Sequence, residues 1–172
     1  LFVGGLYTAV GIERFEGNIG QDQLTGIISI ITTLASSIFA FAIGKVSAKV
    51  GNFKVFAVFT SVNMLLPILM IFCYNYYLYI FIIFMSAVIY TAWILEFTMV
   101  MGFSTPERRH QYIAFTSLIK LIPIVIYTNM GGYLANAFSP TVAFVISSSF
   151  CFIGLIILFV KLRPLWEIKK QV

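Results

Sequence analysis

Long uncharged stretches, separated by short polar segments, dominate the pattern of hydrophobic and polar positions. Twenty-two residues without a charge separate Asp22 from Lys45, which is the length of one membrane-spanning helix. The 41 uncharged residues between Lys54 and Glu96 would measure ~62 Å as a helix, about twice the thickness of a bilayer's hydrocarbon core. They therefore predict two crossings, with a break at the asparagine and tyrosines of residues 74–77.

The rest of the chain repeats this pattern. Another 40 uncharged residues lie between Lys120 and Lys161, and the segment NAFSP at 136–140 predicts a turn inside them. The pattern thus predicts an all-α, polytopic integral membrane helical bundle with five full transmembrane helices plus one partial helix. The predicted spans are residues 24–43, 55–74, 77–101, 112–134 and 141–160. The opening apolar run is too short to cross a bilayer, so we expect residues 1–17 to be the end of a truncated helix.

Composition excludes a soluble globular domain. Of the 172 residues, 60% are hydrophobic, 17% aromatic and only 10% charged, whereas soluble domains carry about 25% charged residues. Lipid must therefore contact most of the surface. Cys73 and Cys151 both lie inside apolar runs without the spacing of a metal site, so we predict no metal and no cofactor.

The few charges predict the orientation of the chain. Nine basic residues fall on one side of the predicted topology: Lys45, Lys49, Lys54, Arg108, Arg109, Lys161, Arg163, Lys169 and Lys170. With Glu107 and Glu167 this side carries +7, and the opposite side, with three acidic residues and one arginine, carries −2. The positive-inside rule places the basic side in the cytoplasm, together with a C-terminal tail at 161–172. We therefore expect a multi-pass plasma-membrane protein and no nucleic-acid partner.

Two cytoplasmic loops resemble those of a known family. The first reads GKVSAKVGNFK, in which Gly44 is expected to allow close helix approach and Gly51 to adopt the positive φ of a tight turn. The spacing of Gly44, Lys49, Gly51 and Lys54 resembles the loop signature of the major facilitator superfamily. The second loop, TPERRHQYIAF at 105–115, is similar to the connection before that family's eleventh helix.

The resemblance covers essentially the whole chain, as the family's C-terminal half from late helix seven to helix twelve. One departure is Ala48, which stands where the family loop usually has an acid. The resemblance implies a secondary active transporter that moves a small solute by alternating access. It also implies contact with membrane lipid, an N-terminal transporter half as partner, and no enzymatic activity.

Two charged residues, Glu96 and Lys120, lie inside predicted spans. Helical rise places Glu96 ~12 Å and Lys120 ~16 Å from the cytoplasmic ends of their helices. An ionised residue near mid-membrane costs about 2.5–3.5 kcal/mol, so it normally faces a partner or a water-filled cavity. We expect the two residues to pair with each other or to line one aqueous cavity. A structural pair, or a protonated Glu96 bound to a hydroxyl, is the alternative.

Other polar and aromatic residues share the faces of these two charges. Thr116 and Ser117 stand one turn before the lysine and Tyr127 two turns after it, while Trp93 precedes the glutamate by one turn. Glu96 is thus a candidate proton-coupling or counter-charge residue and the lysine a candidate contact for an anionic group. Trp93, Tyr127 and Thr116 complete the predicted substrate or ion pathway.

The first full span also carries a polar stripe, formed by Thr25, Ser29, Thr32 or Thr33, and Ser36. Spans 55–74 and 141–160 lack such a stripe, and the resemblance places them at the family's periphery. An intramembrane enzyme would need converging acids, bases or ligands, and only the glutamate, the lysine and a distant His110 are available. A non-transporting membrane bundle, such as a sensor or a degenerate remnant, is the remaining alternative.

Overall fold

The computed structural model of the chain describes residues 4–15 and 20–162. Within these residues every element is helical, as the hydrophobic pattern predicted: α1 (Gly4–Phe15), α2 (Gln21–Val50), α3 (Asn52–Ile71), α4 (Tyr76–Phe103), η1 (Pro106–Arg108), α5 (Arg109–Ala137), α6 (Pro140–Ile157) and the π-helical η2 (Leu158–Leu162). The five helices α2 to α6 are long and apolar enough to cross a membrane, which confirms the all-α bundle with five full spans. The predicted tail from residue 163 onwards lies outside the described residues.

The connection between α2 and α3 is much shorter than expected. Residues 44–54 were predicted as a loop, but all of them except Gly51 are helical. The chain reverses at Gly51, whose φ of 94° favours glycine, and the Gly51 amide closes α2 on the carbonyl of Ser47 at 2.9 Å. The expected close approach at Gly44 is wrong, because a Cβ there would meet nothing within 4 Å.

Polar side chains cap the beginnings of α4 and α6. The side chain of Asn75 accepts a hydrogen bond of 2.8 Å from the Tyr77 amide and begins α4, at the turn that the sequence predicted. Ser139 caps α6 in the same way, directly before Pro140. Thr105 occupies the N-cap position of η1 but makes no side-chain cap bond.

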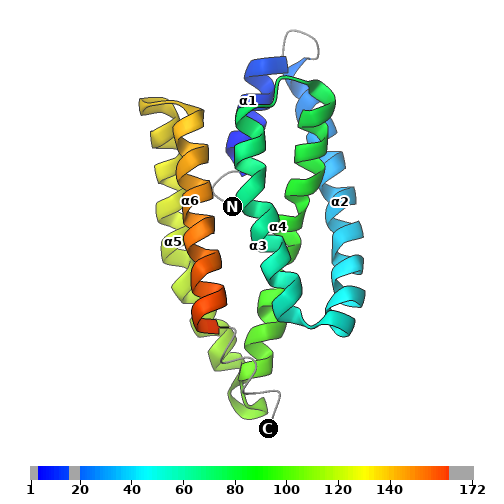
Figure 1. The fold of residues 1–172 in the computed structure, drawn as a ribbon, viewed down its shortest axis with the longest axis vertical. Helices are drawn as coiled ribbons and strands as arrows, with labels where there is room; N and C mark the ends of the chain where they lie inside the picture. Colours follow the sequence, from blue (N-terminus) through cyan, green and yellow to red (C-terminus); the bar gives the residue numbers. More distant parts are fainter. Residues whose placement is uncertain (1–3, 16–19, 163–172) are drawn as a thin grey trace.

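The helices pack around α3 and α4 (Figure 1). Helix α3 contacts both α4 and α6, and α2 packs mainly against α4. The short α1 lies at one end of the bundle, where it completes the largest apolar cluster. Buried members of this cluster are Tyr7, Val10, Phe15, Leu24, Ile28, Leu66, Met70, Cys73, Tyr79, Ile82, Ile83 and Phe144. Helix α5 packs less extensively, against α6 and α4, and leaves most of its surface exposed.

Arg14 ties α1 to the end of α3. Its Nη1 donates to the backbone carbonyls of Met70 at 3.1 Å and Cys73 at 2.6 Å, and its guanidinium lies over the ring of Tyr74. These carbonyls belong to the last turn of α3 and the segment after it, where backbone acceptors have no helical partner. A positive charge at the C-terminal end of a helix also complements the helix dipole.

Candidate functional site

A cavity of about 570 Å³ opens between α3, α4 and α5, and it contains both intramembrane charges. Its lining is mostly apolar, with a few polar groups from each of the three helices. The lining residues are Phe56, Phe59, Thr60, Asn63, Ile89, Ala92, Trp93, Glu96, Ser117, Lys120, Leu121 and Ile124. A cavity of this size falls within the range of about 300–1,000 Å³ typical of small-molecule sites.

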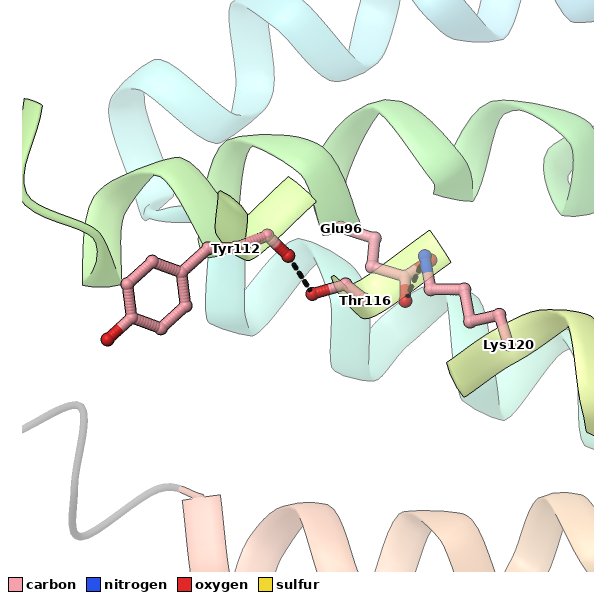
Figure 2. A network of polar contacts seen from close by, with 4 residues as sticks. All are labelled: Glu96, Tyr112, Thr116 and Lys120. Atoms are coloured by element: carbon pink, nitrogen blue, oxygen red, sulfur yellow. Dashed lines mark hydrogen bonds and ion pairs between the residues drawn. The ribbon is translucent and has the colours of Figure 1, made fainter. Parts of the chain in front are cut away.

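Glu96 and Lys120 form an ion pair at the cavity (Figure 2). The Nζ of Lys120, on α5, lies 2.6 Å from Oε1 of Glu96, on α4, and Figure 2 shows the two side chains pointing toward each other. It is the one salt bridge within the part of the chain that the structure describes. The side chains are 27% (Lys120) and 38% (Glu96) exposed, so the pair borders open space rather than a closed core.

Aromatic rings complete the surroundings of the ammonium group. The Lys120 Nζ lies 5.8 Å from the ring centroid of Trp93 and 5.7 Å from that of Phe97. The two rings stack in parallel, 5.6 Å apart, because their residues are four positions apart on one helix face. Ring faces attract cations at such distances, so the rings and the carboxylate hold the same positive charge.

Helix α3 adds polar groups that the sequence did not lead us to expect at this place. We expected span 55–74 at the periphery, but Thr60 and Asn63 line the cavity. The Thr60 hydroxyl donates to the carbonyl of Phe56 at 2.9 Å. The Oδ1 of Asn63 is buried and has no hydrogen-bond partner among the described residues. Hydrophobic spacing alone could not reveal this, because it does not show which side of α3 faces the neighbouring helices.

Comparison with known proteins identifies the family. The family model of the Major Facilitator Superfamily matches residues 3–170, nearly the entire chain. The chain belongs to the major facilitator superfamily. No curated protein and no solved structure gives a significant match.

Membership in the major facilitator superfamily makes the chain a membrane protein of a transporter family. The cavity contains part of the pathway that the sequence predicted. Glu96, Lys120 and Trp93 all line it. Thr116 does not line it, and its hydroxyl donates to the Tyr112 carbonyl at 2.7 Å within α5 (Figure 2). Its neighbour Ser117 lines the cavity instead. The side chain of Tyr127 lies outside the described residues.

The polar stripe of α2 lies away from this cavity. The hydroxyls of this stripe donate to the carbonyls four residues earlier; the side chains of Thr25, Ser29 and Thr33 are exposed, and that of Ser36 is half-buried. No residue of α2 lines the cavity. Hydroxyl groups bonded within their own helix commonly serve helix packing in membranes.

The loop-motif residues also lie outside the cavity. Lys49 stands in the last turn of α2 and is exposed, and Lys54 borders a separate apolar groove of about 220 Å³ between α2 and α3. The described residues contain no group of three or more His, Cys, Asp or Glu side chains that could hold a metal ion. Among the residues that line the cavity, Glu96 and Lys120 are the acidic and basic ones.

Proposed function

We propose that the chain is the C-terminal half of a secondary transporter that moves a small solute by alternating access. In this proposal the cavity between α3, α4 and α5 lies on the solute pathway. The observation that carries it is the Glu96–Lys120 ion pair, which sits within two membrane-spanning helices beside about 570 Å³ of open space. Transporters commonly place solute and ion sites near mid-membrane, at the interface between their two halves, so we expect an N-terminal half as partner.

The energetics support a role beyond packing. Each charge on its own would cost about 2.5–3.5 kcal/mol near mid-membrane, and an apolar pair of similar volume is often at least as stable as a buried ion pair. A purely structural pair would be best enclosed, yet both of these side chains are more than a quarter exposed. Exposure to a cavity leaves both charges open to exchange with a solute or a proton.

Transport in proteoliposomes tests this proposal, using the protein in its full natural length. We expect Glu96→Gln and Lys120→Met each to reduce solute uptake at least about tenfold, which corresponds to about 1.4 kcal/mol. The matched control is Glu107→Gln, which removes an exposed carboxylate from η1, outside the cavity lining. Uptake that both cavity variants leave unchanged would contradict the pathway. A native protein that moves no solute would support the non-transporting bundle.

We also propose that solute transport is coupled to proton movement, with Glu96 as the proton carrier. A proton on Glu96 would neutralise the carboxylate and free Lys120 from its ion pair at 2.6 Å. We expect Glu96→Gln to abolish solute-driven proton movement, measured with a pH-sensitive dye inside the vesicles. Exchange of labelled for unlabelled solute should persist, because exchange needs no net proton transfer. Proton movement that survives in Glu96→Gln would assign the coupling to another group.

A further inference from the structure

We propose that the cavity binds a hydrophobic organic cation, whose charged group takes the place of the Lys120 ammonium beside Glu96. This inference rests on the proposed function, since it treats the cavity as the solute site. The cavity already holds a tethered cation: the Lys120 Nζ lies 2.6 Å from the carboxylate and within 6 Å of two ring centroids. The same groups can therefore hold a free ammonium or phosphonium.

The polar groups of the cavity favour a cation over an anion. The side chains of Glu96 and Lys120 are 38% and 27% exposed, so an entering ligand can reach the ion pair. The Oδ1 of Asn63, on a lining residue, adds a buried acceptor without a partner. An anion would have to displace the carboxylate from Lys120 and would then meet the electron-rich faces of Trp93 and Phe97.

The apolar lining indicates the rest of the ligand. The apolar side chains that line the cavity include Phe56 and Phe59 from α3, Trp93 from α4, and Leu121 and Ile124 from α5. A small hydrophilic cation would leave this surface without contacts, whereas a ligand with an apolar body would bury it. The ligand class is therefore a monovalent cation with an aromatic or aliphatic body that fits within about 570 Å³.

Lys120 acts as a built-in competitor in this arrangement. The free cation binds at Glu96 only when the lysine side chain has left it. The apparent affinity is therefore the intrinsic affinity multiplied by the fraction of protein in which the ion pair is open. Removing the ammonium should therefore tighten cation binding. An anion site built on Lys120 would show the opposite change, so the sign of this effect separates the two.

Two ions of matched shape and opposite charge provide the test. We would measure equilibrium binding of tetraphenylphosphonium and tetraphenylborate to the purified full-length protein. We expect the phosphonium to bind more tightly than the borate. Lys120→Met should tighten phosphonium binding about fivefold or more, and Glu96→Gln should weaken it about tenfold or more. Trp93→Leu should weaken it about threefold, while Glu107→Gln should leave it unchanged.

Folding is controlled by a double variant, Glu96→Gln with Lys120→Met, which leaves no unpaired charge in the membrane. It should keep the helical content and elution volume of the native protein, and it should bind the phosphonium no better than Glu96→Gln alone. Tighter borate binding that Lys120→Met abolishes would overturn the inference, as would equal binding of the two ions or binding of neither. Solute transport that depends on Glu96 while binding shows no cation preference would reject this inference and leave the proposed function standing.

Discussion

Gly11 provides the sharpest test of the packing in the large apolar cluster. Replacing it with alanine would place a Cβ on top of the phenol oxygen and ring carbons of Tyr79. Tyr79 is fully buried, and its hydroxyl donates to the Tyr7 carbonyl at 3.3 Å. Its ring also contacts that of Phe15, with centroids 5.3 Å apart. The Gly11→Ala change must therefore move the tyrosine out of its place in the core.

The expected penalty follows from these contacts. Overpacking a well-packed core costs about 1–3 kcal/mol, and losing the Tyr79 hydrogen bond costs about 0.5–1.5 kcal/mol. The higher helix propensity of alanine relative to glycine offsets about 1 kcal/mol of this penalty. Gly26→Ala is the matched control, because Gly26 also lies inside a helix and a Cβ there meets nothing within 4 Å. The helix term cancels in the comparison, so Gly11→Ala should be less stable than Gly26→Ala by about 1.5–4.5 kcal/mol.

Two measurements check this difference. Unfolding in mixed micelles with increasing dodecyl sulfate, followed by circular dichroism, gives the free energies of both variants. In a Cys151→Ser background, alkylation of Cys73 reports on the same cluster, since burial raises the pKa of this thiol and keeps its thiolate scarce. Gly11→Ala should speed alkylation and Gly26→Ala should not. Equal stability of the two variants, or a penalty that persists after Tyr79→Leu, would refute the reasoning.

Two further predictions concern helix ends. Arg14→Gln should destabilise the protein by about 1.5–3 kcal/mol, because its charged hydrogen bonds to Met70 and Cys73 are lost, and it should expose Cys73 to alkylation; unchanged stability would show that the arginine does not hold the end of α3. Gly51→Ala should cost about 1–3 kcal/mol, because φ of 94° with ψ of 144° is a conformation that residues other than glycine rarely adopt, whereas Gly44→Ala, inside α2, should stabilise by about 1 kcal/mol. Unfolding of both variants measures the contrast, and a destabilising Gly44→Ala would restore the expected close approach at that position.

Several features of the fold could be predicted because the bilayer constrains them. The uncharged stretches have lengths that match one or two crossings, and the turn at Asn75 combines a good N-cap residue with an interfacial aromatic cluster. The end of α2 could not be placed in this way. Residues 44–50 include two lysines, which lower the local hydropathy and therefore suggested a loop. They contain no proline or other residue that ends a helix before Gly51.

The candidate site was predicted in part for a similar reason. An acid and a base at comparable depth on two neighbouring spans have few partners in a membrane, so the meeting of Glu96 and Lys120 could be anticipated. The sequence could not show that Ser117, rather than Thr116, lines the cavity. Adjacent helical positions differ by about 100° in direction, and the spacing left both residues on the face of Lys120. The place of Asn63 at the cavity could not be predicted either, because the spacing does not say which side of α3 faces α4 and α5.

The sequence by itself determined that this chain is an all-α membrane bundle and which two charges lie well away from the ends of its membrane-spanning helices. Hydrocarbon thickness and the cost of burying charge act on every span separately, so both follow from composition along the chain. Only the tertiary structure decided which side chains share the cavity, because tilt and rotation of each helix depend on packing against its neighbours. It brought α3, α4 and α5 around one cavity, left the α2 hydroxyls outside, and surrounded one ammonium group with a carboxylate and two rings.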